Sequence, residues 1–186
     1  MSVPVETGRA LRKDAAANRE RVLTAAAEVF HEQGLSAGLE DVARRAGVGV
    51  GTVYRRFPIR EALLEALLED LFTAYLAEAD SALALPDGQG LAAFVRAAGE
   101  VQATPRGAAL RLWTSTAVEE LRSRLHARID ELVHDAQHAG TCGDDVVVED
   151  VVAVFVAVRG VRETLTAGVA LDWRRHLELC LAGLRP

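Results

Sequence analysis

Residues 46–58, AGVGVGTVYRRFP, decide the fold because they join two short helical segments through a glycine-spaced turn. The spacing of apolar residues predicts one helix over residues 39–46, LEDVARRA, and a second over residues 50–56, VGTVYRR. Gly47 permits the sharp turn between them, and Pro58 ends the second. Two short helices in this arrangement are the sequence form of a helix-turn-helix.

A small apolar core is expected to hold this motif together. Val42, Val48 and Val53 have the spacing to pack with Phe30 and Phe57, which flank the motif in the sequence. The opposite side of the second helix then remains exposed to solvent.

The exposed side of the second helix carries hydroxyl and guanidinium groups, which suit the phosphate oxygens of DNA. In a helix-turn-helix the second helix enters the major groove. The residues expected on this surface are Val50, Gly51, Thr52, Tyr54, Arg55 and Arg56. The alternative is an ordinary turn between two surface helices, with solvated arginines.

The rest of the chain also has helical periodicity, because apolar residues return every three or four positions. Residues 14–33 predict a first helix that Gly34 ends, and residues 60–85 predict a long amphipathic helix that Pro86 ends. Further helices are predicted over residues 88–103, 106–114, 116–139, 147–168 and 172–184. The expected fold class is therefore all-α, with about nine helices.

The expected organisation is a flexible N-terminal tail (1–13), a helix-turn-helix domain (14–59) and a larger helical domain (60–186), which the helix over residues 60–85 links. The charged side chains also differ between the N-terminal and C-terminal parts of the chain. Residues 1–62 hold ten Arg or Lys against eight Asp or Glu, whereas residues 63–186 hold eleven against nineteen. A mildly basic N-terminal segment followed by an acidic remainder gives limited support for a nucleic-acid partner.

Nothing in the sequence predicts export or membrane insertion. No apolar run approaches the roughly 18 residues of a membrane span, and the N-terminus, MSVPVETGRALRKD, lacks the apolar centre of a signal peptide. Cys142 and Cys180 are too few for a disulfide framework. The expected location is the cytoplasm, with no membrane partner.

Residues 19–67, RERVLTAAAEVFHEQGLSAGLEDVARRAGVGVGTVYRRFPIREALLEAL, resemble the N-terminal domain of the TetR family of transcriptional regulators. The matching features include EDVA at 40–43, AGV at 46–48, GTVY at 51–54 and REALL at 60–64. The resemblance implies two sets of DNA contacts. Backbone contacts are implied for Thr52, Tyr54, Arg56 and Arg60, and base contacts for Val50, Gly51, Thr52 and Arg55. Arginine pairs bidentately with guanine, so Arg55 is the best candidate for a base contact, with a phosphate contact as the alternative.

Four positions depart from the family pattern, because each lacks a hydroxyl where a helix is expected to begin: Ala37, Gly38, Gly49 and Ile59. Glycine at an N-cap costs only about a few tenths of a kcal/mol relative to serine, so the fold is not in question. We expect the affinity for DNA to depend more on the arginines, and therefore to fall steeply with salt.

The C-terminal two-thirds of the chain resemble the family's ligand-binding and dimerisation domain in helix count and order alone. Residues 146–165, VVVEDVVAVFVAVRGVRETL, are apolar nearly all round, so a helix there must be buried on two sides. One side can face its own domain, and the other most simply faces a second copy. The residues expected at this dimer interface, or seam, are Ala153, Ala157, Gly160, Leu177, Leu181 and Leu184. A twofold dimer, which the resemblance also implies, predicts a palindromic operator.

A ligand pocket is expected where aromatic and polar residues of several helices converge. The candidates are Phe72, Tyr75, Phe94, Arg111, Trp113, Leu121, Leu125, Phe155 and Arg159. Trp113 is the strongest because a buried indole needs a partner for its N–H. A role in the core also explains most of them, and an ion pair with Glu163 one turn on also explains Arg159.

Metal binding and catalysis have less support. His134 and His138 share a helix face and Cys142 follows, but AGTCGDD at 139–145 is typical of a loop, and polar residues late in a helix are usually solvated. The sequence has no phosphate-cradling glycine loop, nucleophile elbow or paired-carboxylate site. We therefore expect no metal, no cofactor and no enzymatic activity.

The sequence as a whole predicts a homodimeric regulator, most simply a repressor. It would bind a palindromic operator in double-stranded DNA, associate with the nucleoid when bound, and be released by a small-molecule effector. Two alternatives remain open: a DNA-binding regulator without a small-molecule effector, and a helical binding scaffold that has lost its affinity for DNA.

Overall fold

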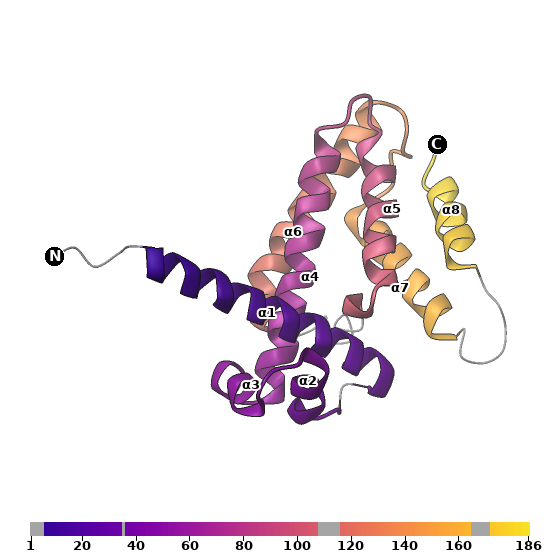
Figure 1. The fold of residues 1–186 in the computed structure, drawn as a ribbon. Helices are drawn as coiled ribbons and strands as arrows, with labels where there is room; N and C mark the ends of the chain where they lie inside the picture. The colour runs from indigo at the N-terminus through magenta and orange to yellow at the C-terminus, as the bar shows by residue number, and fades with distance from the viewer. Residues whose placement is uncertain (1–5, 35, 108–115, 165–171) are drawn as a thin grey trace. The chain divides into compact units, whose positions relative to one another are not determined.

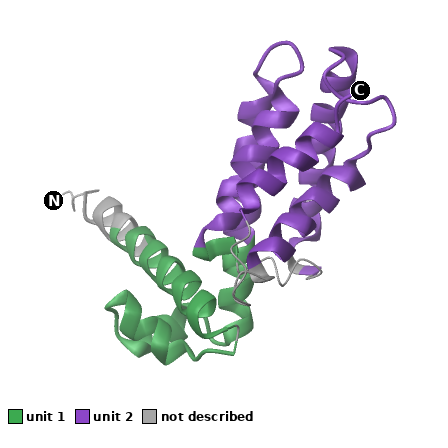
Figure 2. Cartoon of the chain, turned by 90° about the vertical axis from the view of Figure 1, so that its right-hand side faces the viewer, with its two compact units in different colours: residues 1–68, 105–114 green, residues 69–104, 115–186 purple. Residues whose placement is uncertain are grey.

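The computed structural model describes residues 6–34, 36–107, 116–164 and 172–186. In this part of the chain the protein has eight α-helices and no β-strand, so the all-α prediction is confirmed. The chain divides into two compact units (Figure 2). Unit 1 comprises Met1–Leu68 with Pro105–Thr114, and unit 2 comprises Glu69–Thr104 with Ser115–Pro186.

Unit 1 contains the helix-turn-helix. Its helices are α1 (Glu6–Gln33), α2 (Leu39–Ala46), α3 (Val50–Arg56) and the first part of α4 (Arg60–Leu83) (Figure 1). The bounds of α2 and α3 are those that the sequence predicts. Helix α4 is continuous, and its residues from Glu69 onward belong to unit 2.

The first helix is longer than its apolar periodicity indicates. It begins at Glu6, so the prediction that it begins at Asp14 is wrong. Residues 6–13, ETGRALRK, contain several good helix formers and no proline, so their intrinsic propensity favours a helix. At the other end Gly34 adopts a left-handed φ of +85°, and its N–H donates to the carbonyl of Phe30 at 3.1 Å.

The predicted core of the motif is present in unit 1. Phe30, Val42 and Val53 are each at most 1% exposed, and Phe57 is 5% exposed. Val48 is only half-buried, because it lies in the turn rather than on a packed helix face. Replacing apolar side chains here would therefore loosen all three helices at once.

The turn between α2 and α3 depends on Gly47, whose φ of +64° is left-handed. The N–H of Gly47 donates to the carbonyl of Arg44, and the N–H of Val48 donates to the carbonyl of Ala43. Both helices begin at glycines, Gly38 and Gly49, whose missing side chains leave the helix starts without a side-chain cap.

Unit 2 contains the remainder of α4 and five further helical elements. These are α5 (Gly90–Ala103), the 3-10 helix η2 (Thr116–Val118), α6 (Glu119–His138), α7 (Val148–Thr164) and α8 (Trp173–Gly183) (Figure 1). Most of the predicted helix over 106–114, and the predicted end of the helix over 147–168, lie outside the described residues. The core is built from buried side chains of all five α-helices, among them Phe72, Phe94, Leu132, Val158 and Leu177.

Ion pairs join neighbouring helices across the surface of unit 2. Arg96 of α5 donates to both carboxylate oxygens of Glu178 of α8, at 2.6 and 2.9 Å. Arg174 of α8 donates in the same way to Glu100 of α5, at 2.7 and 2.8 Å. Because all four side chains are substantially exposed, these pairs orient α8 more than they stabilise it.

Candidate nucleic-acid interface

The residues predicted to contact DNA lie together on α3 and at the start of α4, all within unit 1. Val50 and Tyr54 are 42% and 41% exposed. Gly51, Thr52, Arg55 and Arg56 are exposed as well. Arg60 is half-buried and donates to the carboxylate of Glu61 at 2.9 Å.

The arginines of unit 1 differ in whether a carboxylate neutralises them. Arg45 of α2 donates to Glu28 at 3.0 Å and to Glu32 at 2.6 Å, and this fastens α2 to α1. Among the described residues, by contrast, no carboxylate forms an ion pair with Arg55 or Arg56 of α3. Two exposed cations on one short helix are therefore available for an anionic partner.

Tyr54 is held by a hydrogen bond that the sequence pattern does not indicate. Its hydroxyl donates to the carboxylate of Glu40, near the start of α2, with a distance of 2.6 Å between the oxygens. This bond lowers the pKa of Glu40 below its usual value and raises the pKa of Tyr54. Glu40 therefore stays ionised at neutral pH and places a negative charge beside the exposed face of α3.

Replacing Glu40 with glutamine is expected to raise the affinity for DNA. The amide oxygen of Glu40→Gln can still accept the hydrogen bond from Tyr54, whereas the charge that repels phosphates is removed. We expect a gain of about three-fold at low salt that shrinks as salt screens the charge. Binding to a labelled duplex measures this. Glu149→Gln, which makes the same charge change on α7, is the control, and an equal gain in both variants would contradict the role of Glu40.

A cavity of about 430 Å³ adjoins the exposed face of α3 inside unit 1. Residues from α1 and α3 line it, together with the residue that follows α3: Ala16, Asn18, Arg19, Val22, Thr52, Arg56 and Phe57. The side-chain nitrogens and hydroxyl in this set extend the polar surface from α3 toward α1, as a contact with a DNA backbone requires.

Comparison with known proteins agrees with this geometry. Residues 22–67 match the description "Bacterial regulatory proteins, tetR family", and residues 86–186 match "Transcriptional regulator SbtR-like, C-terminal domain". The second match alone covers more than half of the chain. The chain belongs to the TetR family.

Two solved structures show the same relationship over nearly the whole chain. A TetR transcription regulatory protein from Mycobacterium vanbaalenii is 33% identical, with a TM-score of 0.66, and the match covers 95% of this chain and 99% of that one. The TetR regulator SCO0520 from Streptomyces coelicolor is also 33% identical, with a TM-score of 0.63 and coverages of 90% and 98%.

A curated relative matches over a shorter stretch. The uncharacterized HTH-type transcriptional regulator YvdT of Bacillus subtilis is 39% identical over 62 residues, which are 33% of this chain and 32% of YvdT. The match thus spans about a third of that relative's length. The family and the fold are those of transcriptional regulators, and within the described residues no helix has the length and apolarity needed to cross a membrane.

Residues 86–186 match the C-terminal domain of a TetR-family regulator, and the predicted pocket residues fall into three groups. Phe72, Tyr75, Phe94 and Leu125 are buried. Leu121, Phe155 and Arg159 are half-buried. Arg111 and Trp113 lie outside the described residues.

Three of the predicted aromatic residues form a cluster. Phe155 of α7 stacks on Tyr75 of α4, with ring centroids 6.4 Å apart, and meets Phe94 of α5 edge to face at 5.9 Å. Such geometry is typical of a packed interior. The sequence thus identified residues that do converge, although their convergence alone does not distinguish a core from a ligand site.

Two polar residues beside this cluster were missed by the sequence reasoning. Gln102 of α5 is only 5% exposed. Arg162 of α7 donates to the carbonyl oxygens of Gln102 and Ala103, at the end of α5, and lies 6.0 Å from the ring centroid of Trp173. The available signal was Gln102 itself, a polar residue at the end of the largely apolar segment GLAAFVRAAGEVQA.

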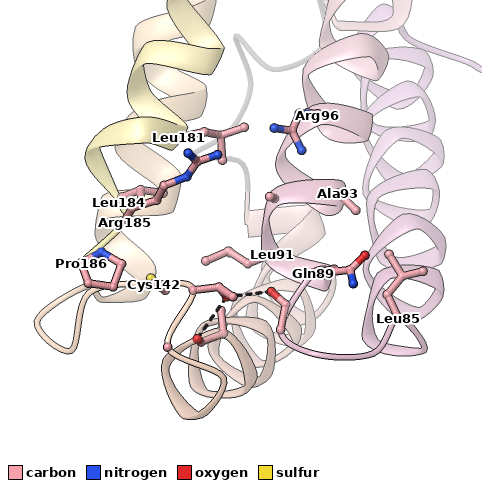
Figure 3. A pocket seen from close by; sticks show the side chains of 15 residues that line it. Leu85, Gln89, Leu91, Ala93, Arg96, Cys142, Leu181, Leu184, Arg185 and Pro186 are labelled. Atoms are coloured by element: carbon pink, nitrogen blue, oxygen red, sulfur yellow. Dashed lines mark hydrogen bonds between the residues drawn. The ribbon is translucent and has the colours of Figure 1, made fainter.

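A separate groove of about 520 Å³ lies in another part of unit 2 and contains none of the predicted pocket residues. Figure 3 shows Leu91 and Arg96 of α5 on one side of it and Leu181 and Arg185 of the C-terminal segment on the other. The Thr141 hydroxyl in its wall already donates to backbone carbonyls of the α4–α5 loop and α6. The other lining residues are mainly apolar.

The residues predicted at the dimer interface differ in how exposed they are. Ala153 and Gly160 of α7 are exposed, and Ala157 and Leu184 are half-buried. Leu177 and Leu181 of α8, however, are only 3% and 5% exposed, because they pack inside unit 2. The opposite face of α8 presents Leu179, which is 60% exposed, and α7 presents Val156, which is 53% exposed.

The histidines considered as metal ligands are directed to their own helix. The Nδ1 atom of His134 lies 2.9 Å from the carbonyl of Asp130, and that of His138 lies 2.7 Å from the carbonyl of His134. Cys142 is buried, which raises the pKa of its thiol. In the described ranges, no three His, Cys, Asp or Glu side chains come together in a way that could hold a metal ion.

Proposed function

We propose that this protein is a ligand-responsive DNA-binding regulator of transcription, acting as a repressor in the cytoplasm and on the nucleoid. The observation that carries the proposal is the exposed face of α3, where Arg55 and Arg56 stand beside Thr52 and Tyr54 without carboxylate partners among the described residues. Membership of the TetR family supports the same function.

DNA binding would follow from the chemistry of α3. The helix would enter the major groove, with Arg55 directed at base edges and with Thr52, Tyr54 and Arg56 on phosphates. The glycine starts of α2 and α3 leave backbone N–H groups, rather than side-chain hydroxyls, to approach the phosphates. Affinity would then depend chiefly on the guanidinium groups and would decrease steeply as salt increases.

The test is a titration of the purified protein with a labelled duplex that spans its own promoter region, repeated at several salt concentrations. The proposal expects tight binding that weakens linearly in a plot of log affinity against log salt. Binding no tighter than to a random duplex, confirmed with fragments selected from the whole genome, would favour the helical scaffold without DNA affinity.

A homodimer is part of the proposal, with the outer faces of α7 and α8 as the seam. Val156 and Leu179 are large apolar side chains exposed on these two helices, and Ala153 and Gly160 allow close approach between backbones. Twofold symmetry would require an operator with two inverted half-sites about one helical turn apart.

Charged substitutions on this face are expected to separate the protomers. In Val156→Asp/Leu179→Asp, two carboxylates per protomer would meet their symmetry mates in a dry interface, so the expected species is a folded monomer. Light scattering coupled to size exclusion measures the mass, and circular dichroism verifies the fold. The control is Val50→Asp/Leu85→Asp, which places the same charges at exposed positions on α3 and after α4, and which should leave the dimer intact. A dimer in both variants would rule out this seam.

Release by a small molecule is the third part of the proposal. Two proteins of the same fold are a gamma-butyrolactone receptor (22% identity, TM-score 0.65, covering 91% of this chain and 97% of that one) and SmeT in a complex with triclosan (20%, 0.62, 90% and 91%). Helix α4 contributes residues to both units. It is therefore the element through which an effector bound in unit 2 could alter the helix-turn-helix of unit 1. An effector that prefers the DNA-incompetent arrangement would shift the population toward it.

A further inference from the structure

Two buried polar atoms of unit 2 lack the hydrogen bonds that buried polar atoms normally have. In the described part of the chain, neither the hydroxyl of Tyr75 nor the side-chain oxygen Oε1 of Gln102 makes a hydrogen bond of normal geometry. Tyr75 is 4% exposed and Gln102 is 5% exposed, so bulk water does not satisfy them. Leaving such groups unpaired is costly, so each of them calls for an explanation, and a partner that binds there is one.

These two atoms lie at one place in unit 2. Burial raises the pKa of Tyr75, whereas the side chain of Gln102, which comes within hydrogen-bonding reach of the Tyr75 hydroxyl, and the charge of Arg162 lower it. Tyr75 therefore remains a neutral hydroxyl at physiological pH, able both to donate and to accept a hydrogen bond. Arg162 is fixed nearby, because it donates to the backbone carbonyls of Gln102 and Ala103.

The immediate surroundings are aromatic. The ring of Tyr75 stacks on Phe155, and Phe155 meets Phe94 edge to face. Tyr75 and Phe94 are buried, whereas Phe155 is half-buried and thus lies between the cluster and solvent.

The groove of Figure 3 gives no comparable evidence for a ligand with a polar group. The hydroxyl of Thr141, in its wall, has two backbone acceptors, and Arg96 at its edge is engaged by Glu178. No residue that lines this groove carries a buried side-chain nitrogen or oxygen without a partner in the described ranges. Of these two places in unit 2, the aromatic cluster rather than the groove therefore offers hydrogen-bonding capacity to a ligand.

We infer that Tyr75 and Gln102 form the polar anchor of the effector site, and that the effector is a hydroxyl-bearing aromatic molecule. A single phenolic or alcoholic hydroxyl satisfies both atoms, because it donates to Oε1 of Gln102 and accepts from the hydroxyl of Tyr75. The apolar ring of the same molecule packs against Phe94 and Phe155. This inference rests on the proposed response to an effector, and names the chemical class that the site selects.

Two probes that differ in one hydrogen-bond donor test the inference. 4-Propylphenol can both donate and accept, whereas 4-propylanisole can only accept. Since a missing donor leaves Oε1 of Gln102 unpaired, the wild-type protein should bind the phenol about ten-fold more tightly than the anisole. Isothermal titration calorimetry measures both affinities. Equal affinities, or no binding of either probe up to its solubility, would overturn the inference.

Two matched variants test whether Gln102 is the residue that causes the preference for the phenol. Gln102→Met removes the acceptor at nearly constant volume and should reduce the phenol preference to less than about two-fold, because the donor of the phenol then has no acceptor and gives it no advantage over the anisole. Gln89→Met makes the same chemical change in the wall of the groove of Figure 3 and should keep the preference. A preference that survives in Gln102→Met, or disappears in Gln89→Met, would place the site elsewhere.

A ligand-free measurement tests the anchor independently. If the hydroxyl of Tyr75 is unpaired, Tyr75→Phe should raise the melting temperature by about 2 °C or more, because a buried unsatisfied group is removed. A fall in the melting temperature would show that the hydroxyl is already satisfied and would contradict the inference. Binding of the wild-type protein to its promoter fragment without any probe tests the proposed function separately, so the two failures are distinguishable.

Discussion

Replacing Arg55 and Arg56 together with alanine is expected to lower the affinity for the promoter fragment at least about a hundred-fold at physiological salt. A guanidinium that contacts a base edge or a phosphate contributes about 1–3 kcal/mol, and a dimer would lose four such groups. Both side chains are exposed on α3 and, within the described residues, neither forms an ion pair, so the substitutions should leave the fold intact. Fluorescence anisotropy with the labelled fragment measures the loss.

The salt dependence separates a role in DNA binding from a general change in charge. Removing contacts to phosphate should flatten the slope of log affinity against log salt. The control is Arg124→Ala/Arg185→Ala, which removes the same charge from exposed positions in unit 2 and should change the affinity by less than about three-fold. A similar loss of DNA affinity in both double variants would mean that α3 is not the helix that binds DNA.

The second large effect is expected in unit 2, where Gly90→Ala should destabilise the fold by about 3 kcal/mol or more. A Cβ on Gly90, the first residue of α5, would lie 2.6 Å from the carbonyl oxygen of Ala82 in α4 and 2.8 Å from a methyl carbon of Leu132 in α6. The backbone carbonyl cannot rotate away, so α5 would have to separate from α4. Urea unfolding followed by circular dichroism measures the stability.

A glycine in open space provides the comparison for this prediction. A Cβ on Gly183, the last residue of α8, meets no atom within 4 Å, leaving aside its chain neighbours and its own helix backbone. Because alanine is the better helix former, Gly183→Ala should leave the stability unchanged or raise it by up to about 1 kcal/mol. Equal urea midpoints for the two variants would show that α4, α5 and α6 approach less closely at Gly90 than described above.

The helix-turn-helix could be predicted because its determinants are local. Gly47 supplies the left-handed turn between α2 and α3, and Phe30 and Val53 mark the faces that pack. The exposed face of α3 then follows from helical geometry. The start of α1 was less predictable, because residues 6–13 can form a helix from their intrinsic propensity without an apolar stripe.

Features that depend on pairing between distant residues could not be predicted. Helical spacing alone did not show which face of α8 packs inward, and the structure buries Leu177 while exposing Leu179. The contact of Arg162 with the end of α5 joins residues 60 positions apart, and the hydrogen bond from Tyr54 to Glu40 joins two helices. Charge neutralisation is equally non-local, so the sequence did not distinguish Arg45, which is paired, from Arg55 and Arg56 on α3.

The most direct test of the account is selection of bound duplexes from a random DNA library by the wild-type protein. Enrichment of a palindrome whose half-sites are about one helical turn apart, bound by two protomers, is the predicted result. No enrichment over the starting library, or enrichment of a single half-site bound by one protomer, would contradict a dimeric regulator that reads DNA through α3.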